Sequence, residues 1–467
     1  MPSAQRYHLK PMDPFLRTKR FKTISAFILG VVLFVASLSY YSSGIKPEVV
    51  HPDEGLRVRM AVYFKLFFMD RDLSDPRWQK REIYLGPPMS AYIVGLALWS
   101  GGQKDKIGET DIDNWWNFKE SFAWNLSNIK LPSEEELYAV KFAMALFASL
   151  SCLAIYWICL KCFGIVTAIF SSLLFLVHPL MLACATRATL DAPLIFFVTL
   201  NILFMLFFYQ NFSKGKFPAS LFFAAIIGLN TAIASGIKIQ GAIAGVIFLI
   251  FCFCIMAAEI IRHFNRDAGE GRDKISWTKK IRMIFASMAL FSMMAMAGFI
   301  LPNPCLYHKP VDGLKKMVEL RVKQIDMQIK EFSTQNYFHE EYNTTLIRSF
   351  SEKMDHMALR MFSDDNKKDL FFLLRFLLFF YGLLLIFLDE IKHLRKNLFF
   401  SPNIVILLWF AVLFAAMAAI IYIDFATHYF TLIVPSVIFM AYAIDQILQR
   451  IFKFIVGEMK LVHRKAA

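Results

Sequence analysis

Residues 241–258 read GAIAGVIFLIFCFCIMAA and contain no charged side chain. With its flanks the run extends over 239–260, and about twenty apolar residues form a helix long enough to cross the roughly 30 Å hydrocarbon core of a bilayer. Lys238 precedes the run, and the basic segment 262–282 follows it. This stretch therefore predicts a membrane-spanning helix with a short polar connection at one end and a basic connection at the other.

Nine further stretches have the same apolar character. They are 22–42, 134–160, 163–183, 191–210, 217–236, 281–301, 369–389, 402–422 and 428–448. Of the 467 residues, 57% are hydrophobic and 19% are charged, whereas soluble domains have about 45–50% and about 25%. This composition excludes a soluble enzyme, a disordered chain and a fibrous repeat. We expect an all-α polytopic membrane protein with about ten transmembrane helices, forming one integral membrane domain over 1–467.

The net charge of +14 is unevenly distributed along the chain. Segments 1–22, 161, 211–216, 262–282, 389–399 and 450–467 together hold 24 Lys and Arg but only 7 Asp and Glu. Basic connections between spans face the cytoplasm, so the pattern places both termini there. We interpret the positive charge as a topology signal that faces anionic lipid, and not as a nucleic-acid footprint.

Two large loops, 43–133 and 302–368, then lie outside the cytoplasm. The first contains the apolar segment 87–101, which at about fifteen residues is short for a span and suits a re-entrant or interfacial helix. The second predicts an amphipathic helix, because apolar side chains recur in it at helical spacing. These are Leu314, Met317, Val318, Ile325, Ile329 and Phe332, with Arg321 among them. Its lysines either form a solvated face or contact a lipid phosphate.

Ionisable residues close to membrane spans are costly and often functional, and three groups stand on the outer side. Asp53 and Glu54 follow the first span as neighbouring carboxylates, so one of them could act as a base; they could equally be an ordinary helix start. Arg187 and Asp191 lie in the turn between two spans, where they could also form a local ion pair. Lys238 could bind an anionic headgroup or merely extend to the interface.

Further polar residues open elements on the same side. His308 lies at the start of the second loop, Arg321 lies on its amphipathic helix, and His428 and Tyr429 open the last span. Carboxylates and cations around a hydrophobic bundle suit transfer between a hydroxyl acceptor and a lipid-borne phosphate leaving group. No Cys or His set has the spacing of metal ligands, so no metal site is predicted.

The ordered motifs resemble the GT-C membrane glycosyltransferases, in the branch of protein O-mannosyltransferases and aminoarabinose transferases. The resemblance rests on His51-Pro-Asp-Glu54, Arg187-x-x-x-Asp191-Ala-Pro193, Gly236-x-Lys238 and Asn303-Pro-x-Leu-Tyr-His308. It also includes the loop motif 84–92, with Tyr84, Pro87, Pro88 and Tyr92. Members of this branch have Glu-Lys before the proline where this chain has Gly86-Pro87, and many have Arg-Tyr where it has His428-Tyr429.

This resemblance implies an inverting glycosyltransferase that moves a sugar from a polyprenyl-phosphate carrier to a protein, lipid or glycan acceptor outside the cytoplasm. Asp53 would be the general base with Glu54 beside it, while Arg187, Asp191 and Lys238 would line the cavity. No nucleotide-binding domain is implied and no cofactor is certain, although a divalent metal ion stays open. The resemblance favours the cytoplasmic membrane of a prokaryote, because 302–368 has no room for the lumenal insert of eukaryotic mannosyltransferases.

The main alternative is a polytopic transporter or lipid flippase of a cell-envelope pathway. Transporters place charges near the bilayer midplane on broken helices, often in repeated halves. In this sequence the acidic residues stand mainly in the outer loops, which favours chemistry at the membrane surface. A structural or assembly protein would not need the ordered set of motifs.

Overall fold

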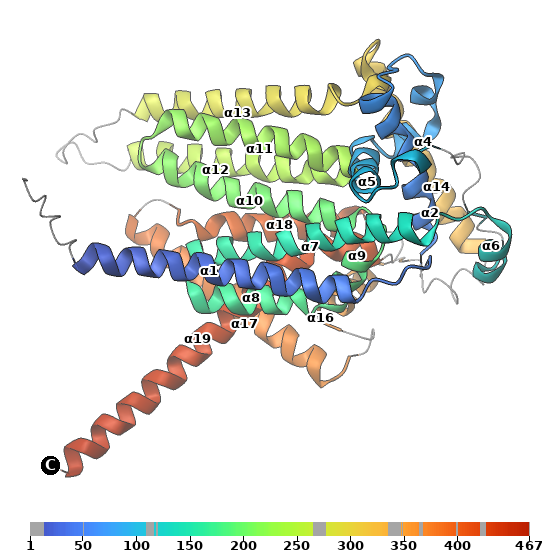
Figure 1. The fold of residues 1–467 in the computed structure, drawn as a ribbon. Helices are drawn as coiled ribbons and strands as arrows, with labels where there is room; N and C mark the ends of the chain where they lie inside the picture. The colour runs from blue at the N-terminus through green and yellow to red at the C-terminus, as the bar shows by residue number, and fades with distance from the viewer. Residues whose placement is uncertain are drawn as a thin grey trace, which may run out of the picture.

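The computed structural model describes residues 14–49, 51–108, 116–117, 120–264, 277–334, 347, 349–363, 368–397, 400–420 and 426–466. Within these residues the regular secondary structure is entirely helical. Eight helices are long and apolar enough to cross a membrane. They are α1 (Pro14–Ser43), α7 (Glu134–Cys162), α10 (Asp191–Ser213), α11 (Phe217–Ile237), α12 (Ile243–Phe264), α13 (Trp277–Ile300), α17 (Leu370–Asn397) and α19 (Ala426–Ala466). Figure 1 shows them packed side by side as a bundle. The protein is an all-α polytopic membrane protein.

The other two expected spans differ from the prediction. The stretch 163–183 is not one helix but two, α8 (Ile165–Leu176) and α9 (Pro179–Thr186), which meet at 63°. Pro179 cannot donate a backbone hydrogen bond, which allows a break here, and the His178 side chain accepts the bond from the Leu180 amide. The stretch 402–422 gives the shorter helix α18 (Asn403–Ile420). The eight spans become nine if the bent pair counts as one.

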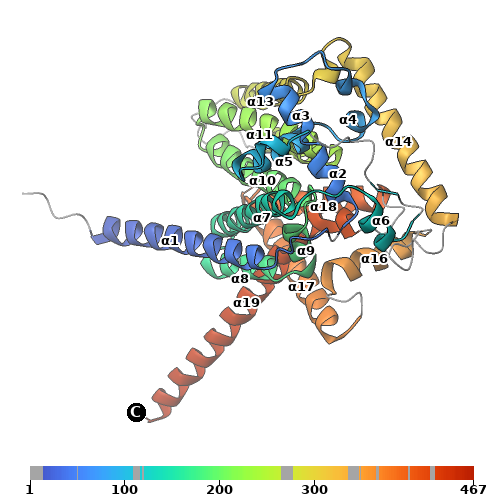
Figure 2. The same cartoon turned by 45° about the vertical axis from the view of Figure 1, so that its right-hand side comes forward.

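Short helices cover one end of the bundle, and they come from both large loops (Figures 1 and 2). From the first loop these are α2 (Asp53–Arg59), α3 (Val62–Phe64), η1 (Lys65–Met69), η2 (Pro76–Gln79), α4 (Arg81–Leu85), α5 (Met89–Ser100), η3 (Lys104–Lys106) and α6 (Phe122–Asn128). From the second they are η5 (Pro304–Leu306), α14 (Pro310–Thr334) and α16 (Phe350–Phe362), while η4 (Ile239–Ala242) joins α11 to α12. We call this the loop end of the bundle.

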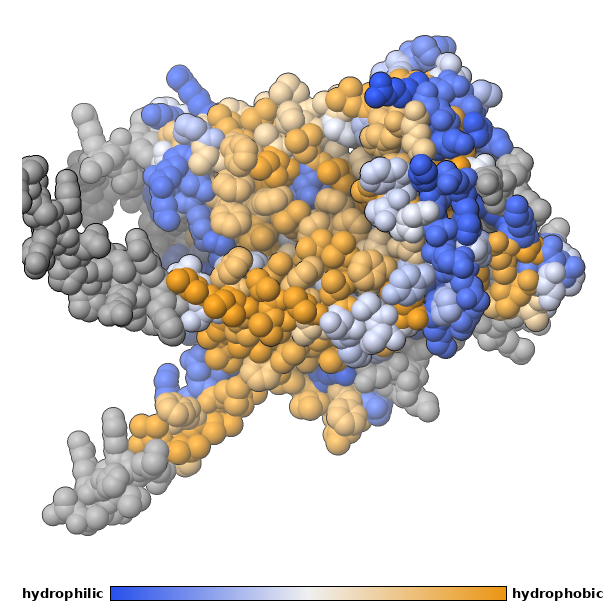
Figure 3. All heavy atoms as spheres, in the orientation of Figure 1, coloured by the Kyte–Doolittle hydropathy of each residue, from blue (hydrophilic) through white to orange (hydrophobic). Residues whose placement is uncertain are grey.

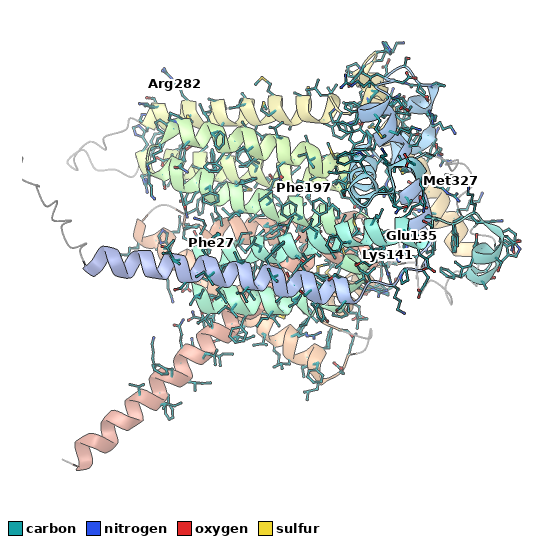
Figure 4. All side chains as sticks on the ribbon, viewed as in Figure 1. Phe27, Glu135, Lys141, Phe197, Arg282 and Met327 are labelled. Atoms are coloured by element: carbon teal, nitrogen blue, oxygen red, sulfur yellow. The ribbon has the colours of Figure 1, made fainter. Side chains whose placement is uncertain are left out.

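The apolar surface lies between this loop end and an opposite end, which we call the basic end. Figure 3 shows an orange band across the visible face with blue patches at both sides of it. Arg282 marks the basic end, and Lys141 lies near the loop end on α7 (Figure 4). The polar residues thus lie beyond the part of the bundle that would sit in lipid, as the hydropathy of the sequence requires.

Close backbone contacts hold the loop end to the bundle. A Cβ at Gly95 of α5 would lie 2.2 Å from Phe64 Cβ in α3, and one at Gly236 would lie 2.8 Å from Met89 Cβ. Tyr92 of α5 donates a hydrogen bond of 2.7 Å to the carbonyl of Pro302, which joins the first loop to the start of the second. Helix α5 is therefore in contact with α3, with α11 and with the start of the second loop.

Helix boundaries follow local capping chemistry where it is present. Ser133 and Glu136 form a reciprocal capping box at the start of α7, which satisfies amides that the first helical turn leaves without a partner.

The predicted amphipathic segment of the second loop is helical as α14, although the side chain of Phe332 lies outside the described part. The last span is longer than expected, because α19 continues from 448 to Ala466 without a break.

Candidate active site

The two carboxylates of the first loop lie side by side at the beginning of α2. Asp53 is its first residue, where the partial positive charge of a helix N-terminus favours an acidic group. The Asp53 amide donates to Nδ1 of His51 at 3.2 Å, and the His51 amide donates to Oε2 of Glu54 at 3.3 Å. These bonds fix the turn that precedes the helix. Asp53 itself is half-buried, whereas Glu54 has no exposed surface.

Glu54 forms a buried ion pair with Lys141 of α7. Lys141 Nζ lies 3.2 Å from Glu54 Oε1, and neither side chain is exposed. The same ammonium donates to the carbonyls of Lys46 at 2.9 Å and Glu48 at 2.7 Å. Glu54 Oε1 also accepts from the amide of Ala188 at 2.9 Å. One ion pair therefore ties the first loop, the α7 helix and the turn after α9 together.

Asp191 and Lys238 form a second ion pair close by. Asp191 begins α10, while Lys238 follows the end of α11 in extended conformation, so two helix ends bring the charges together. Lys238 Nζ donates to Oδ1 of Asp191, which is 1% exposed. Oδ2 of Asp191 is buried and accepts no hydrogen bond from the described residues. A buried carboxylate oxygen without a partner is uncommon, and this oxygen keeps an unused capacity to accept a hydrogen bond.

Charge interactions show that these groups belong to one cluster. Burial lowers the pKa of His51, and the charge of Arg187 lowers it further against the opposing effects of Asp53, Glu54 and Asp191. Burial alone would raise the pKa of Asp53, but the positive charges of His51, Arg57 and Lys238 outweigh it and hold that pKa below its ordinary value of 3.8. Asp53 is therefore ionised at neutral pH.

Two guanidinium groups extend the cluster towards the second loop. Arg321 of α14 interacts with Arg57 of α2: burial lowers the pKa of Arg321, and the like charge of Arg57 adds to this effect. Arg321 donates to Gln324 at 2.7 Å, and Arg57 Nη1 would lie 3.6 Å from a Cβ at Gly86. Among the described residues neither arginine forms an ion pair with a carboxylate. Such an arrangement suits an anion between the two loops.

The loop motif 84–92 has a packing role in the structure. Pro87 and Pro88 are buried, and the Tyr84 hydroxyl donates to Gln79 at 2.6 Å. Lys316 of α14 lies over the Tyr84 ring, 3.9 Å from its centre. Together with the bond from Tyr92 to Pro302, these contacts hold the second loop against the first.

The predicted residues thus fall into three groups. Asp53, Glu54, Arg187, Asp191 and Lys238 lie together, and Arg321 joins them through Arg57. His308 is exposed after η5, and no charge interaction within the cluster involves it. Tyr429 is completely buried in the first turn of α19, whereas the side chain of His428 lies outside the described part of the chain.

Sequence reasoning missed Lys141, and it did not single out His51 or Arg57. A signal for Lys141 was available, because it is an ionisable residue within the apolar stretch 134–160, where such residues usually have a function. For His51 the only signal in the sequence was its position two residues before Asp53. Arg57 follows Asp53 by four residues, and this spacing puts both on one face of a helix.

Two carboxylates of the cluster, those of Glu54 and Asp191, contact ammonium groups. Within the described ranges no group of three or more His, Cys, Asp and Glu side chains is arranged to hold a metal ion. Asp191 contacts Lys238 and Glu54 contacts Lys141, so these two do not form a ligand set together with Asp53. Lys238, Arg187 and Arg57 supply positive charge close to His51 and Asp53.

One protein-family model matches part of the chain. Residues 80–305 match the family model of dolichyl-phosphate-mannose-protein mannosyltransferases. The match covers slightly less than half of the chain, so the chain is similar to this family over that region. The matched region contains the loop motif, Lys141, Arg187, Asp191 and Lys238, while Asp53 and Glu54 precede it. No curated protein sequence matches the chain.

Solved structures show the same fold over almost the whole chain. Apo ArnT from Cupriavidus metallidurans matches with a TM-score of 0.52 and 15% identity, over 92% of this chain and 62% of that one. ArnT bound to undecaprenyl phosphate gives 0.50 and 16%, over 92% and 63%. The Archaeoglobus fulgidus oligosaccharyltransferase with Zn and sulfate gives 0.55 and 13%, over 92% and 51%. The chain spans about half to three fifths of these proteins, and its bundle is GT-C-like.

Proposed function

We propose that this protein transfers a sugar from a polyprenyl-phosphate carrier to an acceptor hydroxyl at the loop end of the bundle, with Asp53 as general base. The hydroxyl oxygen attacks the anomeric carbon, and the bond from that carbon to the phosphate oxygen breaks. The phosphate leaves with the bonding electrons, and Asp53 takes the hydroxyl proton. A single displacement of this kind inverts the anomeric centre.

The observation that carries the proposal is the lowered pKa of Asp53. It is a half-buried carboxylate whose pKa is lowered by His51, Arg57 and Lys238 despite burial. An ionised carboxylate in hydrogen-bonding reach of an acceptor is what a general base requires. Its neighbour Glu54 is fully buried against Lys141, so we assign Glu54 the role of positioning α2 and the chemical step to Asp53.

The departing phosphate requires positive charge that is free to bind it. Arg187 makes no hydrogen bond or ion pair with the described residues, although its charge acts on His51. Lys238 keeps 24% of its side chain exposed while it contacts Asp191. We therefore assign the phosphate to Arg187 and Lys238. Arg57 and Arg321 would hold a further anionic group of donor or acceptor.

The distribution of charge supports a sidedness for the reaction. Arg282 of α13 lies at the end of the bundle opposite the loops (Figure 4). It belongs to the basic segment 262–282 of the sequence, and basic connections face the cytoplasm. We infer that the active site faces away from the cytoplasm and that both termini face it. Single cysteine substitutions would test this: a membrane-impermeant thiol reagent added to intact cells should label Lys315→Cys and leave Lys214→Cys unlabelled.

The activity can be tested with the full chain in lipid nanodiscs. Polyprenyl-phosphate-linked mannose and aminoarabinose serve as radiolabelled donors, with a membrane extract as acceptor, and release of the carrier phosphate is measured. Asp53→Asn should lower transfer roughly 100- to 10,000-fold, the usual contribution of a general base. Asp105→Asn, an exposed aspartate of the same loop, should leave transfer unchanged. Wild-type transfer by Asp53→Asn would refute the assignment of the base.

A further inference from the structure

Arg57 of α2 and Arg321 of α14 are two cations of the cluster that no carboxylate of the described residues neutralises. They lie close enough for the charge of Arg57 to act on Arg321. The hydrogen bonds that their guanidinium groups make are weak or neutral: Arg57 Nη1 lies 3.8 Å from Met60 Sδ, and Arg321 Nη1 donates to Gln324 at 2.7 Å. A guanidinium carries five N–H donors, so these contacts use only a small part of the capacity of either group.

The fold brings both arginines to the junction of α14 with the first loop. Arg57 Nη1 would lie 3.6 Å from a Cβ at Gly86, the residue that follows α4. Helix α14 packs against α4 (Figure 2), and there Lys316 lies over the Tyr84 ring. Arg321 belongs to the half-buried face of α14. The packing of α14 on α4 therefore holds the two like charges near each other.

The acidic side chains that the structure describes on α14 do not neutralise this junction. All three are exposed, and helical spacing places them on the face opposite Arg321. They are Asp312, Glu319 and Asp326. Glu319 lies 3.9 Å from Lys315 instead. Like charges in a partly buried position repel each other more than they would in water, so the junction favours an anion between the two loops.

The charges of the cluster exceed what the carrier phosphate can neutralise. The cluster holds five cations and three carboxylates, which leaves two positive charges in excess. They are Lys141, Arg187, Lys238, Arg57 and Arg321 against Asp53, Glu54 and Asp191. A sugar joined to its carrier by a phosphodiester brings one negative charge, which the proposed function assigns to Arg187 and Lys238. One positive charge remains at the arginine pair, and the acceptor is the other substrate that could neutralise it.

On the basis of the proposed function, we propose that Arg57 and Arg321 bind an anionic group of the acceptor, a phosphate or carboxylate close to the hydroxyl that receives the sugar. Arg57 follows Asp53 on the same face of α2, and the helical rise puts the two residues about 6 Å apart along the axis. An acceptor held by its anion at Arg57 therefore has a hydroxyl a few bonds away within reach of Asp53. Guanidinium groups suit phosphate and carboxylate alike, because they can donate two parallel hydrogen bonds to either.

The test uses inorganic phosphate as the probe and the full chain in phosphatidylcholine nanodiscs at constant ionic strength. Polyprenyl phosphate is added in excess to occupy the carrier site, and phosphate binding is followed as a rise in the thermal midpoint. We expect saturable binding by the wild type. Arg57→Gln and Arg321→Gln should each raise the dissociation constant roughly ten- to a hundredfold, the usual range for a hydrogen bond to a charged group. Lys315→Gln, on the exposed face of α14, should bind phosphate as the wild type does.

The transfer assay provides the second arm of the test. Phosphate should raise the KM for the acceptor extract and leave the donor KM unchanged. Asp53→Asn separates this proposal from the proposed function, because it should lose transfer and still bind phosphate at least as tightly as the wild type.

Three results would overturn the proposal. The first is a wild type without saturable phosphate binding, and the second is full binding by both arginine variants. The third is phosphate binding that polyprenyl phosphate abolishes in the wild type, which would assign the two arginines to the carrier.

Discussion

Glu54 and Lys141 form an ion pair 3.2 Å long in which neither side chain has any exposed surface. Glu54 stands beside the proposed base, and Lys141 comes from a helix that is far away in the sequence. Since Glu54 also accepts the amide of Ala188, the pair sets the distance between Asp53 and the turn that carries Arg187. The geometry of the site therefore depends on a residue that takes no part in the chemistry.

Lys141→Met should destabilise the protein strongly, because it removes the opposite charge that the fully buried Glu54 carboxylate contacts. Loss of one member of a buried pair typically costs about 3–5 kcal/mol, which thermal unfolding in detergent would record as a lower midpoint. Glu54→Gln combined with Lys141→Met should recover part of this loss. Lys315→Met removes the exposed pair with Glu319 and should change the midpoint little. Equal midpoints for Lys141→Met and Lys315→Met would contradict the role of the buried pair.

Lys238→Ala should weaken donor binding more than acceptor binding. The substitution removes a cation from the proposed phosphate site and leaves the buried Asp191 unpaired. A hydrogen bond to a charged group is worth about 1.5–3 kcal/mol, so the donor KM should rise roughly ten- to a hundredfold. Lys214→Ala, at the basic end, is the matched control. An unchanged donor KM in Lys238→Ala would remove Lys238 from the phosphate site.

Arg57→Gln should shift the acid limb of the pH profile of kcat/KM upward. In the wild type the pKa of Asp53 lies below 3.8, and Arg57 is one of the charges that lower it. With one positive charge removed, burial raises that pKa, so Asp53 is protonated and activity is lost at a higher pH than in the wild type. Arg81→Gln alters an exposed arginine of the same loop and should leave the limb in place. A profile of Arg57→Gln that coincides with the wild type would show that Asp53 is not the titrating base.

Two glycine substitutions should have opposite effects on stability. A Cβ at Gly241 would lie 2.2 Å from the backbone carbon of Ala234, so Gly241→Ala forces the η4 segment away from α11 at a cost of about 1–3 kcal/mol. A Cβ at Gly55 in α2 would meet nothing closer than Pro132, at 3.9 Å. Gly55→Ala should stabilise the helix by roughly 0.5–1 kcal/mol. Thermal midpoints that move in the same direction for both variants would disprove this reading of the packing.

Much of the architecture could be predicted because hydropathy and charge act over long segments. Apolar runs such as 239–260 have to cross the bilayer, and the basic segments around Arg262 and Lys392 fix which connections share an end. The same reasoning brought Asp53, Arg187 and Lys238 to one end of the bundle, since each adjoins a span there. Their convergence then follows from the topology alone.

Other features depended on contacts that a sequence does not display. The break at His178 was missed because the apolar run 163–183 is long enough for one span, and only the side-chain and backbone bonds of the bend reveal the two helices. Lys141 was missed because its partners, Glu54 and two backbone carbonyls, are distant in the chain. The extension of α19 was missed because apolar residues beyond 448 alternate with basic ones and fail a test of mean hydropathy.

The bond from the Asp53 amide to His51 also fixes a tautomer. Because Nδ1 of His51 accepts this bond, the neutral imidazole carries its proton on Nε2. A second proton would have to go to Nδ1, where it would replace the bond that holds the start of α2. Acidification would therefore have two effects. It would add a positive charge beside Asp53, and it would break the hydrogen bond that fixes the Asp53 backbone. Protonation of His51 would thus remove a hydrogen bond that holds the first turn of α2.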